Sequence, residues 1–153
     1  MKLLILVIVN LHLFFGEWIE KTGQVASESY TVAFPGEVQT KEGTQEMTLY
    51  HRDKDTALYL LSTNTPPLIH APAEAVKKLL NHHNQPPKSV LAHSVTTKGA
   101  HTILDLEAVH AKTHVKTKIR YVITPHNVWQ LKTAYQDKED HERFVASFDI
   151  KDL

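Results

Sequence analysis

Apolar and polar side chains alternate along most of the chain, the pattern typical of β-strands with one buried face. Tyr30, Val32 and Phe34 alternate with smaller or polar neighbours, and Pro35-Gly36 ends that strand. The same alternation predicts strands near residues 47–51 and 57–62, and four more between Ser89 and Tyr135.

The spacing changes to that of a helix in two places. Pro72 stands where the first turn of a helix tolerates proline, and Asn84 followed by Pro86-Pro87 ends the segment. Its apolar face is predicted to hold Val76, Leu79, Leu80 and His83. A second helix is predicted to be capped by Asp137, with Asp140 three residues later. Its buried side is predicted to hold His141, Phe144, Val145 and Phe148.

Charge predicts the register of the hairpin formed by residues 101–110 and 115–124. If Leu106 faces Ile119, the apolar side chains of both strands share one face. The opposite face then carries two opposite-charge pairs, Asp105 with Arg120 and Glu107 with Lys118. A slip by one residue would place Leu106 against a lysine or arginine, so one register is strongly favoured.

The following hairpin turns through Pro125-His126-Asn127. We expect it to place Ile123 beside Trp129, Tyr121 beside Leu131 and Thr117 beside Tyr135. Together, these elements predict an α+β fold in which an antiparallel meander is flanked by helices.

Composition excludes several classes of function. The chain has 153 residues with no cysteine, and its 17 basic and 17 acidic residues balance. Without an excess of basic residues, we expect no strong nucleic-acid binding. The absence of cysteine excludes disulfides, cysteine-ligated zinc and a thiol nucleophile, and no glycine spacing indicates a nucleotide site. We therefore expect no cofactor.

The first 16 residues have the layout of a secretory signal. Lys2 is followed by an apolar run that is broken only by Asn10 and His12 and ends near Gly16. At ~13 residues the run is short for a membrane-spanning helix, which needs ~20. An uncleaved anchor, or a buried N-terminal strand or helix, are the alternatives. We expect residues 17–153 to form a single domain in a bacterial extracytoplasmic compartment, periplasmic or secreted, with membrane contact only through an uncleaved leader.

The order of these features resembles a known family. The segments that carry the resemblance are Tyr30-Thr-Val-Ala-Phe-Pro-Gly36, Lys98-Gly99, Ile103-Leu-Asp-Leu-Glu107, Arg120-Tyr-Val-Ile-Thr124, Asn127-Val-Trp-Gln-Leu131 and Glu142-Arg-Phe-Val-Ala-Ser-Phe148. Together they are similar to the PsbP-like superfamily, which includes Ran-binding Mog proteins and many exported bacterial proteins. The resemblance covers roughly Trp18 to Ile150 and implies an α-β-α sandwich with a non-enzymatic, protein-binding role. Fold alone does not decide function.

Histidine is the compositional outlier, with 11 residues, and it suits metal binding or pH sensing. The candidate metal ligands are His110 and His114, which flank a tight connection, although zinc normally needs three or four protein ligands. His82 and His83 are adjacent on a helix and point about 100° apart, so they suit chelation poorly. His93, in register with Leu91 and Val95, is expected to face inward.

No catalytic arrangement emerges from the remaining side chains. Asp105 and Glu107 share a face and could act as an acid/base pair, but their predicted cationic partners would lower the pKa of both carboxyls. Serines 62, 89, 94 and 147 stand in no nucleophile motif. Trp129, Tyr121 and Tyr135 could line a ligand groove, but their alternation is typical of core aromatics.

These observations favour an exported, non-enzymatic binding or accessory protein whose partner is another envelope protein. The alternative is a histidine-based metal-binding or pH-responsive envelope protein. A hydrolase with a site assembled from distant residues is the third hypothesis.

Overall fold

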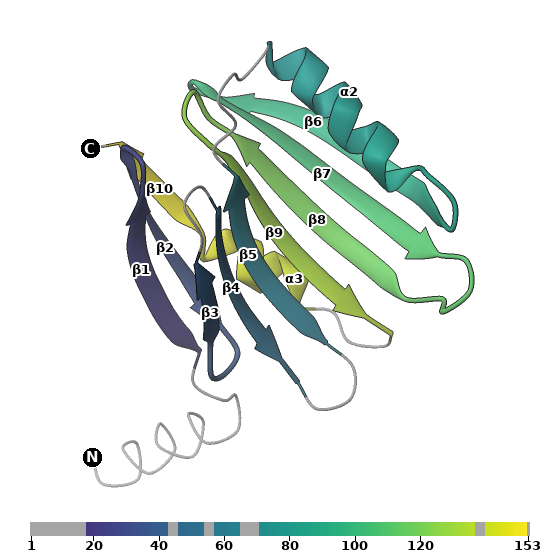
Figure 1. Ribbon diagram of the computed structural model, residues 1–153, viewed down its shortest axis with the longest axis horizontal. Coiled ribbons are helices and arrows are strands. Elements are labelled where there is room, and N and C mark those ends of the chain that lie inside the picture. Colours follow the sequence, from purple (N-terminus) through teal and green to yellow (C-terminus); the bar gives the residue numbers. More distant parts are fainter. Residues whose placement is uncertain (1–17, 43–45, 54–56, 65–70, 137–139, 153) are drawn as a thin grey trace, which may run out of the picture.

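The computed structural model describes residues 18–42, 46–53, 57–64, 71–136 and 140–152. In this part of the chain, two antiparallel sheets are accompanied by two helices, α2 (Pro72–His83) and α3 (His141–Ala146) (Figure 1). The predicted leader and the predicted helix start at Asp137 lie outside the described residues. Neither described helix is long and apolar enough to cross a membrane.

The smaller sheet has three strands in the order β1-β2-β10. They are β1 (Ile19–Val25), β2 (Glu28–Phe34) and β10 (Asp149–Asp152). The alternation of Tyr30, Val32 and Phe34 predicted β2, whose alternate side chains are fully buried. Strands β1 and β10 were not predicted, because β1 is mainly exposed and β10 is only four residues long.

The larger sheet has seven strands in the order β3-β4-β5-β9-β8-β7-β6. They are β3 (Gln39–Glu42), β4 (Glu46–Arg52), β5 (Leu58–Asn64), β6 (Lys88–Lys98), β7 (His101–His110), β8 (Lys116–Ile123) and β9 (Val128–Tyr135). The predicted antiparallel meander is thus confirmed as β6 to β9, although the molecule holds more strand and less helix than predicted. Figure 1 shows α2 lying along β6 and β7, at the opposite end of this sheet from β3.

The predicted register of the β7–β8 hairpin is confirmed. Leu106 pairs with Ile119, and both side chains are buried under α2. On the other face Asp105 pairs with Arg120, and Glu107 with Lys118. Burial of one face and opposite charge on the other both favour this register.

The predicted register of the β8–β9 hairpin is wrong by one residue. Trp129 pairs with Val122 instead of Ile123, and Tyr121 pairs with Gln130 instead of Leu131. Thr117 likewise pairs with Ala134 instead of Tyr135. Because successive side chains of a strand point to opposite faces, this shift turns the large side chains of β9 away from those of β8.

The turn between these strands explains the shift. The backbone N–H of Thr124 donates to the carbonyl oxygen of Asn127 at 3.0 Å. In return, the N–H groups of His126 and Asn127 donate to the hydroxyl of Thr124 at 3.2 and 2.9 Å. The turn therefore closes as Thr124 opposite Asn127, which sets Ile123 opposite Val128. The threonine side chain, which competes well for backbone groups in turns, selects the turn geometry.

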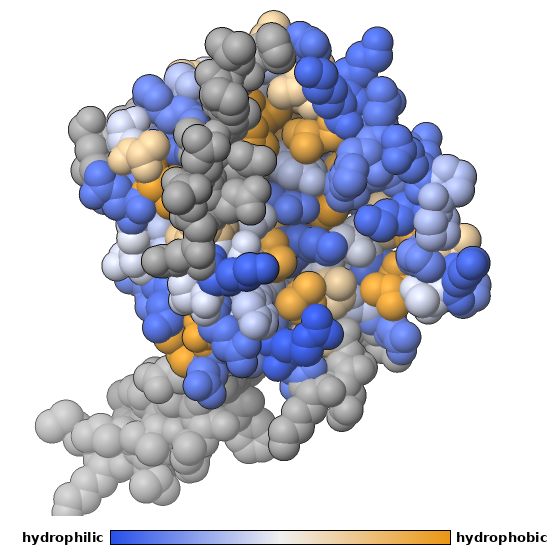
Figure 2. All heavy atoms as spheres, in the orientation of Figure 1, coloured by the Kyte–Doolittle hydropathy of each residue, from blue (hydrophilic) through white to orange (hydrophobic). Residues whose placement is uncertain are grey.

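The shifted register produces two apolar cores on opposite faces of the large sheet. One lies between β4, β5 and β9 and the small sheet with α3, and includes Phe34, Leu61, Trp129, Leu131 and Phe144. The other lies between β7, β8 and α2, and includes Val76, Leu104, Leu106, Ile119 and Ile123. The surface of the same view in Figure 2 is mainly hydrophilic where α2 lies, and its apolar patches are scattered.

Helix α3 is shorter than predicted. It begins at His141 after Asp140, and it buries His141, Phe144 and Val145. Phe148 follows the end of the helix and still packs against the first core. Ser147 fixes this end to the small sheet, because its hydroxyl accepts the backbone N–H of Ala33 at 2.9 Å.

Candidate functional site at the open edge of the large sheet

Strand β6 is the last strand of the large sheet, and among the described strands it pairs only with β7. All of its 11 residues are exposed except the half-buried Val90. Its two large apolar side chains, Leu91 and Val95, are 54% and 48% exposed. A long exposed edge is a template for pairing with another chain, and proteins usually shorten or cover such edges.

Hydrogen bonding in the neighbouring hairpin shows which backbone groups of β6 face outward. The N–H of His110 donates to the carbonyl oxygen of Val115, so the even-numbered residues of β7 bond to β8 and the odd-numbered ones to β6. The β6 partners of those odd-numbered residues include Ala92, Ser94, Thr96 and Lys98. The outward N–H and C=O groups therefore belong to His93, Val95 and Thr97.

The first residues of β6 are protected against pairing with another chain, whereas the residues after Leu91 are not. The N–H of Val90 donates to the side-chain oxygen of Asn84 at 3.1 Å, and the register shifts between Val90 and Ala92. A bulge of this kind bends an edge strand and terminates pairing. Strand addition would consequently use residues 92–98, beyond the bulge.

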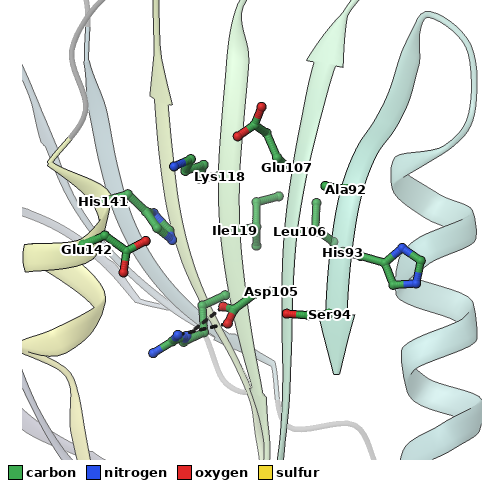
Figure 3. Close-up of a pocket in the computed structure, with 11 residues that line it drawn as sticks. Ala92, His93, Ser94, Asp105, Leu106, Glu107, Lys118, Ile119, His141 and Glu142 are labelled. Atoms are coloured by element: carbon green, nitrogen blue, oxygen red, sulfur yellow. Dashed lines mark hydrogen bonds and ion pairs between the residues drawn. The ribbon is translucent and has the colours of Figure 1, made fainter. Parts of the chain in front are cut away.

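A hollow of about 390 Å³ adjoins β6 on the sheet face that α2 leaves open (Figure 3). Its polar side chains come from β6, β7, β8 and α3, and they are Ser94, Asp105, Glu107, Lys118, Arg120, His141 and Glu142. His93 also borders the hollow, but Figure 3 shows its ring pointing away from the other side chains. The two faces of β6 thus differ, because one borders charged groups and the other lies on the side of α2.

An ion pair lines this hollow. Arg120 donates from Nε and Nη2 to the two carboxylate oxygens of Asp105 at 2.8 and 2.9 Å. Hydrogen bonding to Asp105 raises the pKa of Arg120. Since both oxygens of Asp105 are engaged by the guanidinium, the pair forms a fixed, polar floor, and this supports a structural role for Asp105 over acid/base chemistry.

We expect this ion pair to contribute modestly to stability. Its side chains are 30% and 37% exposed, so solvent screens the attraction, while the two-bond geometry strengthens it. A double-mutant cycle with Asp105→Asn and Arg120→Gln should give a coupling energy of about 1 kcal/mol in urea unfolding. A coupling of zero would show that the pair of Asp105 and Arg120 contributes nothing to stability.

His141 closes the hollow on the side of α3. The side chain is 5% exposed, and its Nδ1 lies 2.8 Å from the hydroxyl of Thr133. Burial lowers the pKa of His141 to about 4, although Glu142 acts in the opposite direction. The imidazole is therefore neutral at pH 7.

The candidate metal ligands His110 and His114 do flank a turn, as predicted. His114 is exposed with φ of 56°, while Nδ1 of His110 accepts the backbone N–H of Thr113 at 3.3 Å. Within the part of the chain that the structure describes, no three His, Asp or Glu side chains are grouped to hold an ion. The structure therefore adds no third ligand to this pair.

The other histidines singled out from the sequence lie in different environments. His83 is buried and its Nε2 lies 2.6 Å from the hydroxyl of Tyr121, whereas His82 is exposed. Because the ring of His83 is engaged in the interior while that of His82 faces solvent, the pair suits shared chelation poorly, as expected. His93 lies opposite Leu106 on the α2 side of the sheet, as its register with Val95 predicted, but it is exposed because β6 is an edge that α2 leaves partly uncovered.

Trp129, Tyr121 and Tyr135 are buried, as expected for core aromatics, and they do not form the alternative, an aromatic groove. Trp129 packs in the core with the small sheet and α3, Tyr135 lies on the same side of β9, and Tyr121 faces α2 on the other side of the sheet. Among the serines, Ser62 donates to the side chain of Gln130 and Ser147 to the carbonyl oxygen of Phe144, which are structural bonds.

Sequence reasoning predicted β6 but missed that it forms an edge. One signal was present: the strand has a lysine at each end and few large apolar side chains, which is typical of edge strands. Comparison of the chain with protein-family models and with curated proteins finds no match.

Proposed function

We propose that this protein is an exported, non-enzymatic binding protein that takes an extended segment of another envelope protein as an added strand on β6. The observation that carries the proposal is the exposed edge at residues 92–98, with the outward backbone groups of His93, Val95 and Thr97. Strand addition uses such an edge, since backbone bonds give affinity and alternate side chains give specificity. The export part rests on the N-terminal sequence alone.

We also propose that the fold is the α-β-α sandwich of the PsbP-like superfamily. Helix α2 lies on one face of the large sheet and α3 on the other, an arrangement compatible with the α-β-α sandwich of the PsbP-like superfamily. The resemblance to that superfamily, which implies protein binding, supports a binding role here as well.

The charge of β6 indicates what kind of segment would bind. The strand carries Lys88, His93 and Lys98 and no carboxylate. Within residues 92–98, an acidic side chain of a partner strand placed opposite Lys98 would form an opposite-charge pair, which is stabilising between paired strands. We therefore propose a partner segment with acidic residues and with β-branched side chains that contact Val95.

Strand addition can be tested with peptides of about seven residues, matching residues 92–98, selected from a displayed random library. We expect the selected peptides to be acidic and extended, and to slow amide exchange at His93, Val95 and Thr97. The decisive variant is Val95→Pro, which removes one outward N–H and leaves the bonds to β7 in place. We expect it to weaken binding about tenfold or more.

The matched control is Val95→Thr, which keeps the backbone N–H and a β-branched side chain. It should bind the selected peptides about as well as the unsubstituted protein. Equal binding by the proline variant, or exchange protection elsewhere, would contradict the proposed site. A stable dimer in sedimentation equilibrium that Val95→Pro dissociates would show instead that the edge pairs with a second copy.

A further inference from the structure

A second hollow, of about 280 Å³, lies on the α2 side of the sheet, near the end of β7. It is bordered by the end of α2, the start of β6, the β7–β8 turn and the second half of β9. Its ionisable lining side chains are all nitrogen bases: His83, Lys88, His110 and Lys132. No carboxylate of the described residues lines it, which sets it apart from the mixed charges of the first hollow.

Lys132 occupies an unusual position for a lysine. It lies in the interior strand β9, between Leu60 of β5 and Ile119 of β8. Burial lowers the pKa of Lys132, and the neighbouring Lys88 lowers it further. Two cations near one another in a partly desolvated site oppose folding unless a negative charge joins them.

The neutral lining has two parts. Apolar side chains come from Ala108, Val109, Val115 and Ala134, and hydroxyl groups from Thr113 and Thr117. His83 belongs to the neutral part at pH 7, since burial and nearby positive charges lower its pKa to about 4. The hollow thus combines two ammonium groups with an apolar wall.

We infer that this hollow binds a compact organic anion, with its oxyanion head group against Lys88 and Lys132 and a short apolar body against Ala108 and Ala134. Phosphate and carboxylate head groups share the required chemistry, because both accept charge-assisted hydrogen bonds from ammonium groups. Mostly apolar lining with a few converging polar groups is typical of small-molecule sites. The inference is independent of strand addition on β6.

The test is an NMR titration of the full chain at constant ionic strength with three separate probes: butyl phosphate, sodium butyrate and inorganic phosphate. We expect saturable shifts of the Ala108 and Ala134 methyl signals with both organic anions. Inorganic phosphate should bind about tenfold more weakly than butyl phosphate, because it lacks the apolar body. Binding should also raise the pKa of Lys132, which the signal of its side chain reports directly.

Lys132→Met and Lys88→Met should each weaken binding about tenfold, since each removes one ammonium group. Methionine keeps an unbranched apolar stem, so both variants are expected to fold. Lys21→Met, on exposed β1, is the matched control and should bind like the unsubstituted protein, as should Val95→Pro. Shifts that do not saturate, or equal losses in Lys21→Met, would overturn the inference. Tighter binding of inorganic phosphate than of either organic anion would overturn the assignment of an apolar body.

Discussion

Replacing Glu28 with alanine is expected to lower the free energy of unfolding by about 3–5 kcal/mol, because three buried donors would each lose a hydrogen bond. Glu28 lies in β2 and is 0% exposed. Its Oε1 accepts hydrogen bonds from the hydroxyl of Thr124 at 2.8 Å, the side-chain amide of Asn127, and the indole N–H of Trp129 at 3.2 Å. This carboxylate ties the small sheet to the β8–β9 turn of the large sheet.

Two control variants test whether these hydrogen bonds account for the loss of stability. Glu28→Gln keeps one acceptor oxygen and should cost clearly less than alanine. Glu20→Ala, on the exposed strand β1, should change the free energy of unfolding by no more than about 0.5 kcal/mol. Urea unfolding of all three variants gives the comparison. Equal effects of alanine at positions 28 and 20 would show that the buried carboxylate does not hold the two sheets together.

Acid is expected to destabilise the protein through His83 and His141. Burial lowers the pKa of each to about 4 in the folded chain, against ~6.5 when unfolded. Between these two pH values, the unfolded state binds more protons than the folded state, so stability falls as pH falls. The contribution of each histidine is complete above pH ~6.5 and is lost progressively towards pH ~4, on the order of 3 kcal/mol apiece.

The measurement is the free energy of unfolding in urea at several pH values between 7.5 and 4. Carboxyl groups also titrate near the lower limit, so the comparison is made with a His83→Gln, His141→Gln double variant. That variant keeps polar side chains near the hydroxyls of Tyr121 and Thr133 but cannot take up the two protons. Its stability should depend less on pH than that of the unsubstituted protein. Identical pH profiles would contradict the prediction.

Local patterns were sufficient for much of the meander. Alternation predicted β2 and β4 to β9, helical spacing predicted α2, and cross-strand charge predicted the β7–β8 register to the residue. The β8–β9 register was wrong because apolar side chains occur at neighbouring positions in these strands. Val122 and Ile123 can each face a core, so burial alone does not distinguish the two registers. The hydrogen bonds of the Thr124 side chain decide between them.

The candidate sites were harder to predict from the sequence, because each depends on which strands and side chains become neighbours in the folded protein. The polar face that carries Asp105 and Arg120 could be predicted, because opposite charges on adjacent strands favour the register that pairs them. By contrast, β6 is a candidate site because among the described strands only β7 pairs with it. The basic hollow brings Lys88 and Lys132 together from strands that are not adjacent in the sheet. The spacing of residues along the chain does not predict that these two lysines lie near each other.

The sequence by itself determined where most strands and α2 lie, because these follow from the spacing of apolar residues. It also determined which side chains of β7 and β8 face one another, because opposite charges on the two strands favour one register. Only the tertiary structure decided that the large sheet buries opposite faces at its two ends, that Glu28 joins it to a second sheet, and that β6 is left exposed. Those outcomes depend on which surfaces pack together across long separations in sequence. The apolar pattern of a strand predicts that one face will be buried, but it does not predict which element will cover that face.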